Sequence, residues 1–242
     1  MKIIAIADLH LSLGEGINKS MEVFGGAWLG YVERLKENWE YIVSPEDLVL
    51  IPGDISWAMH LEEAMADLEW LDALPGKKLL LRGNHDLWWS SMKKMKGLFP
   101  SIEFLQNDAY LDAEHGFAVI GSRGWLCPGD GDFKETEDGK IYRREILRLQ
   151  MSLADLKAKC KASQCFDPYI IGMMHYPPTN ARKDPSDFTD IFRDAGANQV
   201  IYGHLHSEKA FGNGPAGSFE GSYYRLVSLD RLNAMPICLY EC

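Results

Sequence analysis

An α/β fold is predicted by two regularities of the sequence. Short apolar segments of strand length recur along the chain, and amphipathic segments of helical length lie between several of them. The segment 77–86, KKLLLRGNHD, shows the first regularity best, because Leu79, Leu80 and Leu81 form the unbroken apolar run of a strand buried on both faces. Open α/β sheets bind ligands beyond the carboxyl ends of their strands. We therefore expect the functional site where this strand ends, at Asn84, His85 and Asp86.

The expected elements follow in chain order. Strands are predicted at 2–7, 47–52, 169–174 and 198–202, around the apolar run 79–81 before the turn at Gly83, and as shorter segments between 102 and 121. Apolar residues at helical spacing predict helices at 31–42, 61–74 and 142–160, and a short basic helix is expected at 92–98. Loops are expected at 11–30, at 128–139, which could form a lid, and at 177–190. The runs 223–228 and 236–240 are expected to pair antiparallel in a second sheet.

Composition narrows the class of protein. The chain has 242 residues, of which 46% are hydrophobic and 25% charged, as in a soluble globular protein, and we expect a single domain over residues 1–242. A formal net charge of −10 argues against nucleic-acid and membrane-surface partners. Five cysteines without a Cys-x-x-Cys pair favour reduced thiols and a cytoplasmic location. The apolar start is too short for a signal peptide, and no apolar run reaches transmembrane length.

Side chains that bind metals or move protons follow five of the apolar segments. They are Asp8 and His10, Asp54, Asn84 with His85 and Asp86, His175, and His204 with His206. Because side chains alternate along an extended backbone, Asp8 and His10 should point the same way, as should His204 and His206. Each motif alone also fits an ordinary strand end, but the ordered set indicates a metal site. Oxygen and nitrogen donors without a thiolate suit Mn²⁺, Fe or Zn²⁺ better than Mg²⁺ alone.

The ordered set Asp-Leu-His, Gly-Asp, Gly-Asn-His-Asp, His and Gly-His-Leu-His resembles the calcineurin-like metallophosphoesterase superfamily, and it spans residues 8 to 206. The resemblance implies a four-layer αββα sandwich of two mixed sheets with helices outside, and a two-metal centre. One ion would be held by Asp8, His10 and His206, and the other by Asn84, His175 and His204, with Asp54 bridging. A metal-bridging hydroxide would attack phosphorus, and His85 would be the general acid. Asp86 would orient either His85 or the metal ligands.

The continuation after Gly53-Asp54 narrows the subtype. The chain reads Ile-Ser-Trp there, whereas the phosphoprotein Ser/Thr phosphatase branch reads Asp-Arg-Gly, so protein-phosphatase activity is in doubt. We expect a hydrolase of a small phosphomonoester or phosphodiester, with Arg82, Arg123 and Arg182 as candidate substrate contacts. Two alternatives stay open: a nuclease of the same superfamily with a small basic groove, and a metal-binding scaffold without catalysis. The sequence names neither the substrate, the metal pair nor the oligomeric state.

Overall fold

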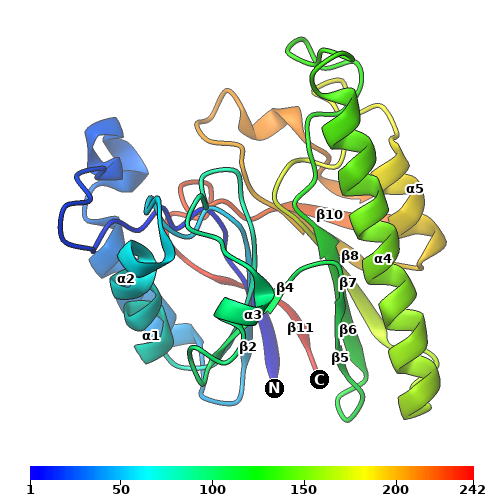
Figure 1. Ribbon diagram of the computed structural model, residues 1–242, viewed down its shortest axis with the longest axis horizontal. Helices are drawn as coiled ribbons and strands as arrows, with labels where there is room; N and C mark the ends of the chain where they lie inside the picture. The colour runs from blue at the N-terminus through cyan, green and yellow to red at the C-terminus, as the bar shows by residue number, and fades with distance from the viewer. The chain divides into compact units, whose positions relative to one another are not determined.

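The computed structural model describes residues 1–242, and these form two compact units (Figure 1). Unit 1 comprises Met1–Phe104 and Val227–Cys242, and unit 2 comprises Leu105–Leu226. Each unit contains helices and one mixed β-sheet, so the predicted α/β class is confirmed. The expectation of a single domain stays a prediction. None of the helices is long and apolar enough to cross a membrane.

The sheet of unit 1 has the strand order β11-β1-β2-β3-β4. Its strands are β1 (Lys2–Ala5), β2 (Leu48–Pro52), β3 (Lys77–Leu81), β4 (Ile102–Leu105) and β11 (Ile237–Glu241). The three strands β1, β2 and β3 are parallel, because helices α1 (Tyr31–Ile42) and α2 (Leu61–Ala73) provide the crossovers that parallel neighbours need. Strand β11 adds to the edge of β1 in the antiparallel direction, so both chain termini lie close together in Figure 1.

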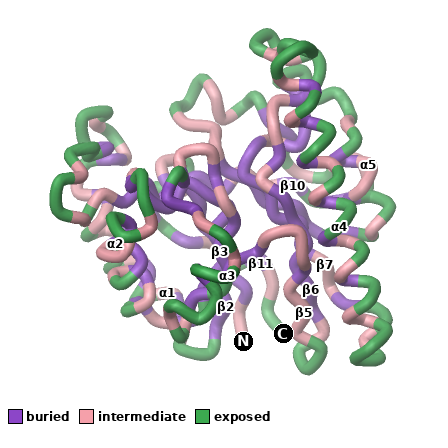
Figure 2. The backbone as a smooth tube through the Cα atoms, in the orientation of Figure 1, coloured by how far each residue is buried: buried purple, intermediate pink, exposed green.

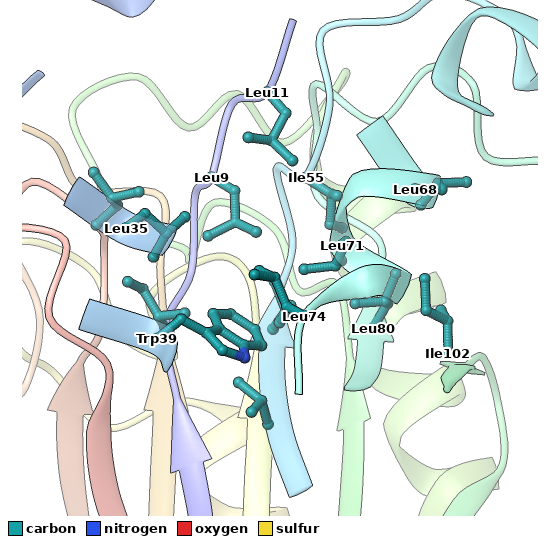
Figure 3. Close-up of a cluster of buried hydrophobic side chains, with 14 of the residues drawn as sticks. Leu9, Leu11, Leu35, Trp39, Ile55, Leu68, Leu71, Leu74, Leu80 and Ile102 are labelled. Atoms are coloured by element: carbon teal, nitrogen blue, oxygen red, sulfur yellow. The ribbon is translucent and has the colours of Figure 1, made fainter. Parts of the chain in front are cut away.

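One hydrophobic cluster joins these helices to the sheet. Leu35 and Trp39 come from α1, Leu68 and Leu71 from α2, and Leu80 from β3 (Figure 3). All five side chains are fully buried, and burying a leucine of this kind stabilises a fold by about 1.5–3 kcal/mol. The indole nitrogen of Trp39 donates a hydrogen bond to the Pro75 carbonyl at 2.9 Å, so its one polar atom is satisfied. This packing makes a rigid base for the loops that follow the strands.

The sheet of unit 2 has the order β5-β6-β7-β8-β10-β9. Its strands are β5 (Ala109–Asp112), β6 (Phe117–Ser122), β7 (Tyr169–Met174), β8 (Gln199–Tyr202), β9 (Gly217–Phe219) and β10 (Ser222–Leu226). The four central strands are parallel, and β5 and β9 are antiparallel edges. Helices α4 (Gly139–Ser163) and α5 (Asp187–Asp194) cover this sheet, whose strands are mostly buried (Figure 2). The ring of Phe192 packs directly on Gly172, where a β-carbon would come within 2.5 Å of it.

Two expectations about these elements are wrong. The segment 177–190 is not wholly a loop, because α5 begins at Asp187, where the Ser186 hydroxyl accepts the N–H groups of Phe188 and Thr189. Strands β10 and β11 do not pair with each other: β10 lies parallel to β8, and β11 lies against β1 in the other sheet. Pairing partners far apart in sequence leave no mark in a short apolar run.

The helix limits also differ from the predicted ones. Helix α4 extends beyond 142–160 at both ends, and α3 (Met92–Met95) is shorter than the predicted 92–98. The predicted loop 11–30 contains two 3-10 turns, η1 (Met21–Phe24) and η2 (Gly26–Trp28), and a third, η3 (Phe211–Asn213), lies in unit 2. Helix ends are set by local capping, which hydrophobic spacing does not report.

Candidate functional site

The donors that follow β1 and β2 sit on left-handed backbone. The φ angles are 59° at Asp8, 44° at His10 and 52° at Asp54. Asp8 and His10 do point the same way, with ligand atoms within 4.8 Å of each other, but the extended backbone expected to align them is wrong. Backbone hydrogen bonds orient them instead: Asp8 N–H donates to the Gly53 carbonyl at 3.0 Å, and His10 N–H donates to the Asp54 carbonyl at 2.9 Å. Left-handed conformations at residues other than glycine cost energy and cluster at functional sites.

Asp54 ties the loops after β1 and β3 together. Its Oδ2 lies 3.7 Å from His10 Nε2, and its Oδ1 accepts the backbone N–H of His85 at 2.8 Å. Gly83 allows this approach, since a β-carbon there would lie 2.1 Å from Asp54 Oδ1. Asp8, His10 and Asp54 are each at most 2% exposed. Two buried carboxylates in one loop cluster need a positive partner to be stable.

The Asp86 carboxylate accepts hydrogen bonds from the loops after β2 and β3 through both of its oxygens. Oδ1 accepts the backbone N–H groups of Ile55 and Ser56 and the indole N–H of Trp88. Oδ2 accepts the backbone N–H groups of Asp54 and Gly83, and all five hydrogen bonds measure 2.7 to 3.2 Å. Burial and then the Asp54 carboxylate raise the pKa of Asp86 to about 7, whereas the N–H donors lower it. Its carboxylate thereby fixes the backbone on which Asp54 stands.

Two tryptophans that the sequence analysis did not select surround His10. Its imidazole stacks on the Trp57 indole, with ring centroids 4.7 Å apart at 22°, and Trp28 meets it edge-on at 5.9 Å. The hydroxyl of Tyr31 donates to the His10 carbonyl at 2.7 Å. The His85 ring lies 4.4 Å from Trp57 and 5.6 Å from His10. The sequence signal that could have pointed to this contact was the position of Trp57, three residues after the candidate ligand Asp54. Trp88 and Trp89, by contrast, are buried away from His10 in the hydrophobic cluster of unit 1, where the Trp88 indole N–H donates to Asp86.

Unit 2 brings its own histidines together beyond β7 and β8. The rings of His175 and His204 lie 5.1 Å apart, and Tyr176 packs on His204 at 4.1 Å. His175 is fully buried, and its carbonyl accepts the Gly203 N–H at 3.1 Å, which joins the two strand ends. The left-handed φ of 70° at His204 shows that the extended alternation expected for His204 and His206 is also wrong.

The three candidate substrate arginines all have partners within their own units. Arg82 Nε donates to the Asp86 carbonyl at 3.2 Å. Arg123 Nη2 lies 3.7 Å from the fully buried Glu145 carboxylate, and Arg182 Nη2 lies 2.9 Å from the Asp184 carboxylate at the surface. Their role in binding substrate stays a prediction.

The donor set fits divalent ions. Six of the predicted side chains are candidate metal ligands, namely Asp8, His10, His206, Asp54, His175 and His204. Asn84, whose side chain offers an amide oxygen, stays a predicted ligand, and no cysteine belongs to the set. Buried carboxylates in one loop cluster are an environment that a divalent cation stabilises, and carboxylate oxygens and imidazole nitrogens are common ligands of such ions.

A comparison with protein families decides the classification. The family described as calcineurin-like phosphoesterase matches residues 1–208 of this sequence. The chain belongs to the calcineurin-like phosphoesterase family. This calcineurin-like phosphoesterase is accordingly a metal-dependent phosphoric ester hydrolase, and the resemblance that its motifs indicated is confirmed.

Two solved structures match this phosphoesterase at low sequence identity. The protein of unknown function AQ665 from Aquifex aeolicus matches with a TM-score of 0.52 and 17% identity, over 98% of this chain and 95% of that one. Phosphopantetheinyl hydrolase (PptH) from Mycobacterium tuberculosis matches with a TM-score of 0.48 and 16% identity, over 94% of this chain and 88% of that one. None of the curated protein sequences matches the chain.

Proposed function

We propose that this calcineurin-like phosphoesterase uses two divalent ions to hydrolyse a small phosphomonoester or phosphodiester. The observation that carries the proposal is Asp54, a buried carboxylate that contacts His10 on one side and the His85 backbone on the other. A ligand shared by two ions has to be reached from both sides and held still. Asp54 is held still because Asp86 accepts hydrogen bonds from five N–H groups, one of which is the backbone N–H of Asp54 itself.

The proposed ligands follow the motif order of the family. Asp8 and His10 would hold one ion with His206, Asn84 would hold the other with His175 and His204, and Asp54 would bridge. When bound, the ions supply Lewis-acid activation of water and neutralise charge that develops on the phosphoryl group. The proposed ligands are oxygen and nitrogen donors without a thiolate, which supports ions of Mn, Fe or Zn as the two native metals.

His85 is the proposed general acid. Its backbone N–H is fixed to Asp54 at 2.8 Å, so the residue stands beside the proposed bridging carboxylate without itself being a proposed ligand. Protonation of the leaving-group oxygen by such a side chain accelerates a reaction by about 10²–10⁴-fold. Asp86 accepts no hydrogen bond from the His85 ring, so its proposed role is to position Asp54 and Gly83.

The surroundings favour a small substrate over a nucleic acid. Arg123 and Arg182, which a basic groove would need, are paired with Glu145 and Asp184, and the net charge is −10. A complete set of ligands together with His85 favours an enzyme over a scaffold. All five cysteines are free thiols, which supports the proposed cytoplasmic location.

The test begins with metal-stripped protein to which Mn²⁺, Zn²⁺, Fe²⁺ or Mg²⁺ is restored singly. We expect two ions per chain by elemental analysis and metal-dependent hydrolysis of p-nitrophenyl phosphate or bis-p-nitrophenyl phosphate, with the preferred ester separating monoesterase from diesterase. His85→Ala should keep both ions and lose turnover on esters with poor leaving groups. His115→Ala is the matched control, because His115 is a half-exposed turn residue paired with Asp112. Absence of metal and of turnover under every ion would favour the scaffold.

A further inference from the structure

The His85 ring is held by aromatic contact. Its backbone N–H is fixed to Asp54, but the imidazole makes no hydrogen bond to another side chain. Its ring contacts are Trp57, at 4.4 Å between centroids, and His10, at 5.6 Å. The nearer of the two is therefore the indole of Trp57.

Trp57 is itself anchored to the segment that carries His10. Its backbone N–H donates to the Leu11 carbonyl at 2.9 Å, and Leu11 forms a β-bridge with Ser56. The indole nitrogen of Trp57 is buried and has no hydrogen-bond partner, so the side chain is oriented by its ring contacts. One of these is the stack on His10, and another is Lys19, whose ammonium lies 5.2 Å from the ring centroid.

We propose that Trp57 is a positioning residue that holds the His85 imidazole against the leaving-group side of the site. This inference rests on the proposed function, in which His85 is the general acid. A proton donor on a freely rotating side chain loses rate because the productive orientation is only one of several rotamers. The Trp57 ring removes the alternatives by packing, and the backbone bond to Asp54 fixes the rest of the residue.

The experiment compares two esters of similar shape, p-nitrophenyl phosphate and phenyl phosphate, or the matching diesters. p-Nitrophenolate is a good leaving group that departs without protonation, whereas phenolate has to be protonated as it leaves. Only the rate on phenyl phosphate therefore depends on the general acid. We expect Trp57→Leu to lower kcat on phenyl phosphate at least about tenfold more than it lowers kcat on p-nitrophenyl phosphate. The upper limit of this selective loss is the whole contribution of a general acid, about 10²–10⁴-fold. Trp57→Phe, which keeps a ring, should fall between wild type and Trp57→Leu.

The matched control is Trp70→Leu, because Trp70 is another half-buried tryptophan against the same core cluster and has no ring contact with a histidine. It should change both esters equally. An equal loss on both esters in Trp57→Leu would overturn the inference, since it would place the effect on His10 or on folding. If Trp57→Leu does not fold by circular dichroism, Trp57→Phe decides by the same criterion.

His85→Ala separates this inference from the proposed function. If His85→Ala itself shows no preference between the two esters, the acid assignment is wrong and the inference falls with it. If His85→Ala selectively loses phenyl phosphate but the Trp57 variants do not, only the positioning role of Trp57 is wrong. In the double variant, Trp57→Leu should add no further selective loss to that of His85→Ala.

Discussion

Gly83→Ala tests the site at its tightest point. The added β-carbon would lie 2.1 Å from Asp54 Oδ1 and 2.3 Å from the Asp54 backbone nitrogen, whereas ordinary contacts begin near 3.4 Å. The carboxylate or its loop must therefore move by about 1.3 Å. Neither neighbour yields easily, because the nitrogen is backbone and its N–H is bound to Asp86 at 2.9 Å. The substitution should thus displace the proposed bridging ligand.

The expected size of the effect follows from that displacement. A misplacement of about 1 Å at a reacting centre costs about 100-fold in rate, so kcat/KM on p-nitrophenyl esters should fall by about 100-fold or more. Overpacking should also destabilise the fold by about 1–3 kcal/mol, which lowers Tm by about 2–4 °C per kcal/mol in a protein of this size. Elemental analysis should show less than the wild-type metal content.

Gly131→Ala is the control, since a β-carbon at Gly131 meets no heavy atom within 4 Å and its backbone is not left-handed. It should match wild type in metal content, turnover and Tm. The reasoning is refuted if Gly83→Ala binds two ions per chain and turns over at the wild-type rate. That result would mean that Asp54 need not occupy its present position.

Two further predictions concern buried charges in unit 1. Asp86→Asn replaces one acceptor oxygen with an NH₂ group, so at least two of the five N–H donors lose their acceptor. Each unsatisfied donor costs about 1–3 kcal/mol, so the free energy of unfolding measured in urea should fall by about 2–6 kcal/mol. An unchanged urea midpoint would contradict the role given to Asp86. Burial, partly offset by Asp72, lowers the pKa of Lys78 from 10.5 to about 8. Between these values the unfolded state binds more protons, so Lys78 makes stability rise as pH increases from about 8 to about 10.5, and below pH 8 its contribution is constant. Lys78→Met should remove this rise, which unfolding free energies at pH 7.5 and pH 9.5 measure; an unchanged slope would exclude Lys78 as its source.

Local patterns predicted the elements that carry the site. Helix α1 matches its predicted limits of Tyr31 and Ile42, and the predicted apolar run Leu79–Leu81 lies within β3, because burial on one stripe or on both faces leaves an apolar pattern in the sequence. The candidate donors were selected by residue type at strand ends, which needs no knowledge of the fold.

The parts that failed depend on contacts distant in sequence. The short apolar run at β11 gives no sign that its partner is β1, more than 230 residues away. The left-handed backbone at Asp8 and Asp54 results from hydrogen bonds between two loops, and an extended strand was the natural assumption. Trp57 was missed because its importance lies in what it touches, and a tryptophan in a sequence is most often a packing residue.

The pairing of β1 with β11 has a consequence for the order in which the chain folds during synthesis. Unit 1 is discontinuous, since residues 105–226 are inserted between its two parts, and Ala7 also binds the Val227 carbonyl at 2.8 Å. Unit 2 is continuous and has all its strands once residue 226 has left the ribosome. The inserted unit can therefore fold first, while β1 waits with an open edge that could pair wrongly. Strand β1 is thus made before unit 2 but is completed only after it, when β11 pairs with it.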